Sequence, residues 1–195
     1  KPKVLIQASA IGYYGSRQDE PLDEFSSPGE GFLSQVVQQW ELSTQEVESL
    51  NVRRIICRSG LALGKEGGAL PRLLLPFRFF VGGPLGRGKQ WFSWIHLQDE
   101  VRAIRFLMER RDLSGVFNLA SPNPLRQKDF SRILGKVMKR PSWLPLPAPL
   151  FRLFLGEKAK ETLLSSQKVV PNRLLEAGFK FLFPDLELAL REILD

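Results

Sequence analysis

The stretch VLIQASAIGYYGS (residues 4–16) runs from a branched apolar segment into small residues, a tyrosine pair and a glycine. Residues 3–10 show no clean alternation of apolar and polar side chains, which is typical of a strand buried on both faces of a parallel sheet. Ligands bind outside the carboxyl ends of the strands in such sheets. We therefore expect an interior strand whose exit presents Ser9, Tyr13 and Tyr14 at a binding edge.

Strand-like and helix-like segments alternate along the first 140 residues. Further strands are expected at 52–59, 89–97 and 115–120, and helices at 29–50, 68–80, 98–112 and 126–140. This alternation favours a mostly parallel sheet with helices on both faces. The chain is therefore predicted to be an α/β protein with a doubly wound sheet.

Two of the expected helices carry apolar residues that should face the sheet. The inward residues of helix 29–50 should be Phe32, Val36 and Trp40, with Leu33, Val37 and Thr44 on neighbouring turns. Those of helix 98–112 should be Val101, Ile104, Leu107 and Met108, and that helix should be capped by Gln98 or Asp99.

The pattern changes after Pro141, where PSWLPLPAPL forms a proline-rich connection. Beyond it only helical patterns follow, at 151–169, 171–178 and 184–195. We expect two units: the sheet domain at 1–144, and a small helical C-terminal domain at 145–195.

The charge distribution indicates which classes of partner the protein could bind. The net charge is +7, and residues 1–50 hold three basic and eight acidic side chains. The basic remainder suits a nucleotide cofactor, an anionic substrate or nucleic acid, or it is simply a solvated face. Helix 126–140 has no interleaved aromatic residues suited to base stacking, and its apolar face is needed by the core, so a nucleic-acid partner is not expected.

The location of the protein is inferred from what the sequence lacks. Cys57 is the single cysteine, lies in an apolar run and cannot form an internal disulfide, which fits a reducing compartment and a buried thiol. No membrane span or secretion leader is expected. We therefore expect a cytoplasmic protein, and an organellar location stays open.

Three strand exits carry small or polar residues that could form the floor of a nucleotide site. Ser9 follows the first strand, and Arg58, Ser59 and Gly60 close the second; Ser121 and Asn123 follow another. Polar, glycine-rich strand exits are also common in proteins without such a site, so the signal is weak by itself.

The sequence resembles the extended short-chain dehydrogenase/reductases, and within them an atypical, epimerase-like branch with its own C-terminal helical domain. The matching stretches are ASAIGYYG, QQWE, RSGLALGKEGGAL, LPFRFFVGGPLGRGKQWFSWIHLQD, SGVFNLASPNP and LLSSQKVVPNRLLEAGFKFLFPDLELALREIL. The resemblance implies a Rossmann-type fold that binds NAD(P), with NADP favoured and NAD as the alternative. It also implies an oxidoreductase or epimerase reaction on a small hydroxy or carbonyl substrate, such as a sugar derivative. A non-catalytic NAD(P)-binding protein on the same fold is the alternative. The oligomeric state stays open.

The sequence departs from this resemblance in two ways. No G-x-G-x-x-G turn follows a strand, so the resemblance implies roughly a hundred further residues before Lys1, about one mononucleotide-binding half. The Tyr-x-x-x-Lys pair of the superfamily is also missing, because the matching helix offers Phe32 with Val36, or Leu33 with Val37. Any proton exchange must therefore use other groups.

The proposed catalytic residues are Ser9, Tyr13, Tyr14 and Glu41. Ser9 matches the superfamily's substrate-binding hydroxyl, although a strand-end serine can instead bond its own backbone. A tyrosine needs a neighbouring cation to act at neutral pH, for which the candidates are Arg58, Arg87 and Lys89, and one of the two tyrosines should only pack. Glu41 is read as a base or substrate ligand, or as an ordinary surface residue.

The other expected site residues contact ligands. Those assigned to the cofactor are Ser9, Ala10, Arg58, Ser59 and Gly60. Those assigned to the substrate are Lys89, Gln90 and Trp91, from a glycine-rich loop, and His96, whose alternative is a structural role. No metal site is expected, since the sequence has one histidine and one cysteine.

Overall fold

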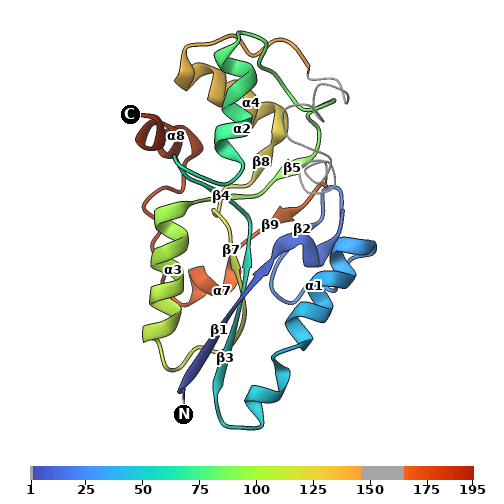
Figure 1. Cartoon of the computed structure of the whole chain (residues 1–195), viewed down its shortest axis with the longest axis vertical. Coiled ribbons are helices and arrows are strands. Elements are labelled where there is room, and N and C mark those ends of the chain that lie inside the picture. Colours follow the sequence, from blue (N-terminus) through green and yellow to red (C-terminus); the bar gives the residue numbers. More distant parts are fainter. Residues whose placement is uncertain (1, 146–164) are drawn as a thin grey trace.

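The computed structural model describes residues 2–145 and 165–195. Its central layer is a parallel three-stranded sheet in the order β1-β3-β7 (Figure 1). These strands are β1 (Val4–Ala10), β3 (Arg53–Ser59) and β7 (Gly115–Leu119). All three fall within the expected ranges, so the predicted parallel α/β sheet is confirmed. Within the described residues, however, β1 is an edge strand rather than the expected interior one.

Helices cover both faces of this sheet (Figure 1). One face packs against α3 (Leu97–Glu109) and α7 (Asn172–Glu176), with Ile55, Cys57 and Phe117 of the strands in the shared core. The other face carries α1 (Phe32–Leu42) and the 3-10 turn η1 (Ile11–Tyr14), and a second 3-10 turn, η2 (Gln45–Glu48), follows α1. Because side chains alternate along a strand, the neighbours of Ile55 and Cys57 point to the α1 side.

A second core lies beyond the carboxyl end of the sheet. It is built on α2 (Leu70–Arg78), α4 (Gln127–Met138) and α8 (Leu186–Leu194), whose apolar residues meet around the fully buried Trp94. Short strand pairs complete this region: β4 (Leu61–Leu63) with β6 (Trp94–His96), and β5 (Trp91–Phe92) with β8 (Leu125–Arg126). The helices α2, α3 and α4 fall where the sequence predicts them.

The predicted inward face of α1 is mostly wrong, because Val37 is the one residue of that face that is buried within the helix. Phe32 is 72% exposed and Trp40 46% exposed, whereas Ser34, Val37 and Glu41 are the buried residues. The helix turns its polar residues inward because they have partners there: the Ser34 hydroxyl donates to two backbone carbonyls, and Glu41 pairs with Arg58. Hydrogen bonding therefore outweighs the apolar pattern on this helix.

The predicted inward face of α3 is partly wrong as well. Leu107 is fully buried, but Val101 and Met108 are more than half or half exposed, and Ala103 and Asp99 fill the buried face. His96 is the N-cap, and its Nδ1 accepts a hydrogen bond from the Gln98 amide. Asp99 is not the cap because its carboxylate accepts from two backbone amides of the C-terminal segment, those of Leu182 and Phe183.

The C-terminal residues 166–170 bond to the N-terminal part of the chain. A helix was expected over 151–169, but residues 168–169 form β9 (Lys168–Val169), which pairs in parallel with β2 (Pro21–Leu22). This stretch is extended because its backbone bonds to the N-terminal loops rather than to itself. Residues 165–167 are not helical either, and residues 151–164 of that expected helix lie outside the described residues. In contrast, α7 and α8 fall in their predicted ranges.

The helices after β9 share hydrophobic clusters with the strands and helices before residue 145. The division of the chain at residues 144–145 adjoins residues that the structure does not describe, and it stays a prediction. Among the described residues, no helix has the length and the apolar character needed to cross a membrane.

Candidate functional site

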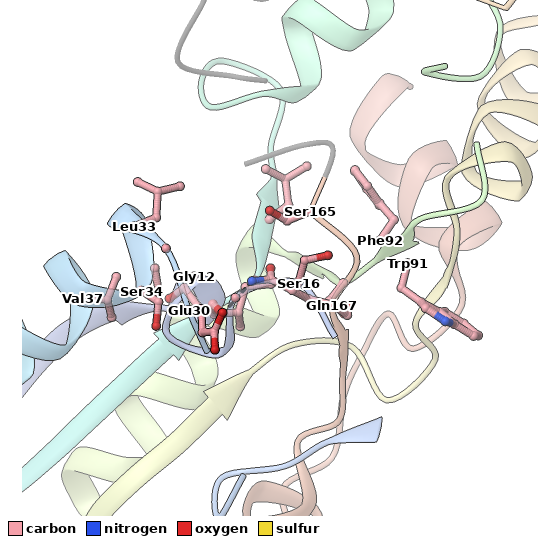
Figure 2. A pocket seen from close by; sticks show the side chains of 18 of the residues that line it. Gly12, Ser16, Glu30, Leu33, Ser34, Val37, Trp91, Phe92, Ser165 and Gln167 are labelled. Carbon is pink, nitrogen blue, oxygen red and sulfur yellow. Dashed lines mark hydrogen bonds between the residues drawn. The ribbon is translucent and has the colours of Figure 1, made fainter. Parts of the chain in front are cut away.

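A cavity of about 490 Å³ opens at the carboxyl ends of β1 and β3. Its volume lies in the range of about 300–1,000 Å³ typical of small-molecule sites. Its floor is formed by the strand exits, one wall by η1 and the start of α1, and the other wall by β5 and the residues before β9 (Figure 2). The lining residues include Ala10, Ile11, Gly12, Glu30, Leu33, Ser34, Val37, Ser59, Gly60, Trp91, Phe92, Ser93 and Gln167.

The strand register decides which residues reach this floor. Ser9 pairs with Arg58, and one position further Ala10 pairs with Ser59. Ala10, Ser59 and Gly60 line the cavity, whereas Ser9 does not. The position of Gly60 tolerates no larger residue without movement, because an added Cβ would lie 2.9 Å from the carbonyl oxygen of Ser93.

Ser9 instead belongs to a buried polar cluster behind the wall. Its hydroxyl donates to Glu41 Oε1 at 2.6 Å. The Arg58 guanidinium holds both oxygens of the same carboxylate, with Nε donating to Oε1 and Nη2 to Oε2, each at 2.8 Å. Burial by itself would lower the pKa of Arg58, but the hydrogen bonds to Glu41 raise it, so this arginine stays charged. Glu41 is therefore neither a free base nor a surface residue.

The cluster continues to the two tyrosines. Arg58 Nη1 donates to the Tyr14 hydroxyl at 3.0 Å, and that hydroxyl donates to Asn118 Oδ1 at 2.7 Å. The guanidinium carbon lies 3.3 Å from the centroid of the Tyr13 ring, a cation–π contact. Of the three predicted cations, Arg58 is thus the one placed beside the tyrosines.

Burial is the main reason that the pKa of Tyr14 rises to about 12, and the charge of Arg58 opposes the rise only in part. The Tyr14 phenol is fully buried and does not line the cavity. At neutral pH it therefore holds its proton and orients its neighbours. Tyr13 does not line the cavity either, so neither tyrosine of the pair reaches it.

The loop that joins η1 to α1 is closely packed against the backbone of η1. The Gly29 amide donates to the Tyr13 carbonyl at 2.9 Å, and an added Cβ at Gly29 would lie 2.1 Å from the Tyr14 carbonyl oxygen. A side chain at this position would force the two segments apart. Glu30 follows, exposed at the cavity rim, and is the one acidic or basic residue among the described lining residues.

The opposite wall is anchored by Trp91. Its indole Nε1 donates to Asp19 Oδ1 at 2.7 Å, and Asp19 also pairs with Arg126. The guanidinium carbon of Arg126 lies 4.3 Å from the centroid of the indole ring, and Nζ of Lys168 lies 4.7 Å from it. The hydrogen bond from Trp91, followed by that from Arg126, lowers the pKa of Asp19.

Other residues predicted for the site lie elsewhere. Lys89 is exposed and does not line the cavity, and Gln90 donates to the Leu85 carbonyl within its own loop. Ser121 and Asn123 both donate to the Pro184 carbonyl, because the segment before α8 covers the exit of β7. These strand-exit groups hold the C-terminal segment and are not part of the cavity floor.

His96 is also absent from the cavity lining. It is 2% exposed, its Nε2 lies 2.8 Å from Glu192 Oε2 of α8, and its ring packs on Phe183. Because Nδ1 accepts from Gln98, Nε2 carries the proton and donates it to Glu192. The structural alternative is the better description of His96.

Several residues of the site were not anticipated, Gln167 and Asn118 among them. Gln167, which lines the cavity and donates to the Ile11 carbonyl, falls in a stretch read as helix. Asn118 closes the polar cluster from β7, and a buried asparagine inside an apolar strand was the signal that could have found it. In the part of the chain that the structure describes, no group of acidic, histidine or cysteine side chains could hold a metal ion.

A parallel sheet with helices on both faces, and a cavity at the carboxyl ends of its strands, defines a Rossmann-type protein. Comparisons with known proteins are more specific. The chain is 40% identical over 195 residues to epimerase family protein YfhF of Bacillus subtilis, matching 100% of this chain and 64% of that protein. It is 42% identical over 194 residues to the chloroplastic SDR39U1 homolog of Arabidopsis thaliana, again over 100% of this chain but 55% of the relative.

A solved structure agrees with these relatives. Human epimerase family protein SDR39U1 (isoform 2), solved with NADPH, matches with a TM-score of 0.89 and 33% identity, over 98% of this chain and 65% of that one. Residues 146–193 match a family described as a domain of unknown function, DUF1731. The chain is thus similar to epimerase family proteins along its whole length, and its C-terminal residues match this domain family. It spans between about half and two thirds of the length of these relatives.

Proposed function

We propose that the protein binds NADP(H) and acts as an oxidoreductase or epimerase on a small hydroxy or carbonyl compound, such as a sugar derivative. The single observation that carries the proposal is the cavity at the carboxyl ends of β1 and β3, because this is where Rossmann-type sheets receive their ligands. The human relative solved with NADPH supports NADP over NAD.

The residues of the cavity fit a nicotinamide ring. Ala10 and Gly60 leave space at the strand exits, Ile11 and Phe92 supply apolar walls, and Ser59 offers a hydroxyl. When bound, the nicotinamide supplies or accepts the hydride. The protein's own residues hold the ring and the substrate carbon together and exclude water. In this proposal Trp91 bounds the substrate side, away from α1.

One observation favours a second candidate, a non-catalytic NADP(H)-binding protein. Proton exchange at a substrate oxygen needs a titratable group within reach. Glu30 is the one such side chain among the described lining residues. Tyr14 and Glu41 lie behind the wall, where each is already hydrogen-bonded to other protein groups. A protein with this arrangement could hold the cofactor without turnover.

The experiment that separates the two candidates uses the full-length protein. NADPH is titrated first, followed by absorbance measurements of the reduced nicotinamide with a panel of aldehydes, ketones and keto-sugars. Binding followed by oxidation of NADPH with one substrate class supports the enzyme. Binding without oxidation across the panel supports the second candidate. Absence of NADPH binding contradicts both.

A further inference from the structure

We propose that Arg58 is a positioning residue that sets the shape of the cavity by holding α1 and η1 at a fixed separation. The inference rests on the proposed NADP(H) site for its functional meaning. Arg58 does not line the cavity. Its buried ion pair with Glu41 instead supports the cavity wall from behind.

The position of Arg58 in the sheet is the first argument. Ser9, Arg58 and Asn118 occupy one row across β1, β3 and β7, paired in register on the central strand. All three are buried. A row of polar side chains inside a sheet is costly unless every group has a partner, and here each one does.

The contacts of the guanidinium are the second argument. Its Nε and Nη2 fix the carboxylate of Glu41 on α1, and its Nη1 fixes the hydroxyl of Tyr14 at the end of η1. The planar fork sets both the distance and the angle between these elements. A lysine could supply the charge but not this geometry.

Both α1 and η1 form part of the cavity wall. On α1, Ser34 and Val37 line the cavity on the same face that presents Glu41 one turn further along. On η1, Ile11 and Gly12 line it, and Tyr14 follows. Arg58 therefore joins the two halves of one wall from behind, and it also stacks on the Tyr13 ring of η1.

A purely stabilising ion pair and a positioning one respond differently to removal. Deleting one partner of a buried pair leaves an uncompensated charge, whereas replacing both with apolar residues of similar size often restores stability. The test therefore compares Arg58→Met, Glu41→Leu and the double variant Arg58→Met/Glu41→Leu in the full-length protein. The matched control is Arg105→Met/Glu109→Leu, an exposed pair on α3.

We expect the double variant to recover the thermal midpoint that the single variants lose, while two local readouts stay altered. Hydrogen exchange at the Gly15 and Gly29 amides, which bond across η1 and its loop, should accelerate by about tenfold or more. NADPH should bind about 10–100-fold more weakly, as expected for a misplaced contact surface. Arg58→Lys should resemble the double variant, and the control should match the wild type.

Wild-type exchange rates at both glycines in the folded double variant would overturn the inference and reduce the pair to a stabilising one. If the wild-type protein does not bind NADPH, that result would instead contradict the proposed function. The exchange measurement needs no ligand, so it decides the role of Arg58 in either case.

Discussion

Ser9 Oγ donates a 2.6 Å hydrogen bond to Oε1 of Glu41, and this contact turns the serine away from the cavity that its neighbour Ala10 lines. The residue that best matched the superfamily's substrate-binding hydroxyl is thus committed to the ion pair behind the wall. Because the Ser9 side chain points away from the cavity, Ala10 rather than Ser9 is the residue of β1 to test for ligand contact.

Ser9→Ala should affect stability more than ligand binding. The variant removes a hydrogen bond to a carboxylate, which is worth about 1.5–3 kcal/mol, while Arg58 still holds both oxygens of Glu41. Urea unfolding and NADPH titration of the same samples check this. A tenfold loss of NADPH affinity at unchanged stability would show that Ser9 contacts the ligand after all.

Tyr14 should make the protein sensitive to alkaline pH. Its pKa is about 12 in the folded state, because of burial, against about 10 in an unfolded chain. The unfolded state therefore loses the phenolic proton first, so the stability that this residue contributes is intact below pH ~10 and is lost as the pH rises to about 12, by at most about 2–3 kcal/mol. The Tyr14→Phe variant should lack this component.

Urea unfolding of the wild type and Tyr14→Phe between pH 9 and pH ~11.5 measures the difference, since lysines titrate in both proteins and cancel. The free energies of unfolding of the two proteins should converge as the pH rises. Parallel curves would mean that the phenol ionises as readily in the folded protein as in the unfolded one.

The Cys57 thiol should be unreactive in the native protein. Burial raises its pKa to about 12, and the residue is 2% exposed in the core between β3 and α3. Because the thiolate is the reactive form, labelling with a thiol reagent should require unfolding. Rapid labelling under native conditions, followed by mass spectrometry to place the label on Cys57, would contradict the packing of this strand.

Much of the fold follows from local patterns, but the choice of faces does not. The alternation of branched strands and amphipathic helices predicted β1, β3 and β7 and the helices α2, α3 and α4. A strand buried on both sides shows no periodicity, however, and a shift of one residue exchanges its two faces. The pattern therefore placed Ser9 and Ala10 at the same edge without telling which of them reaches the cavity.

The polar cluster was beyond local reasoning because its partners are far apart in the chain. Tyr14 and Asn118 are separated by 104 positions, and Glu41 looked like any helix glutamate. The same contacts change which residues of α1 are buried: Phe32 and Trp40 follow the helical period but are exposed, and Glu41 is buried together with Val37. The periodicity of apolar residues predicts which helix face is buried by hydrophobic packing. The buried face of α1 is instead fixed by the ion pair between Glu41 and Arg58.

The most direct test of the nicotinamide site is to fill the cavity from its floor. Ala10→Leu adds a branched side chain at the exit of β1, while Ala177→Leu adds the same atoms at the end of α7, outside the cavity lining. The measurement is NADPH affinity of the full-length wild type and both variants, with thermal midpoints as a check on folding. We predict that Ala10→Leu binds NADPH at least about tenfold more weakly and that Ala177→Leu binds it normally. Wild-type affinity in a folded Ala10→Leu protein would contradict the placement of the nicotinamide in this cavity.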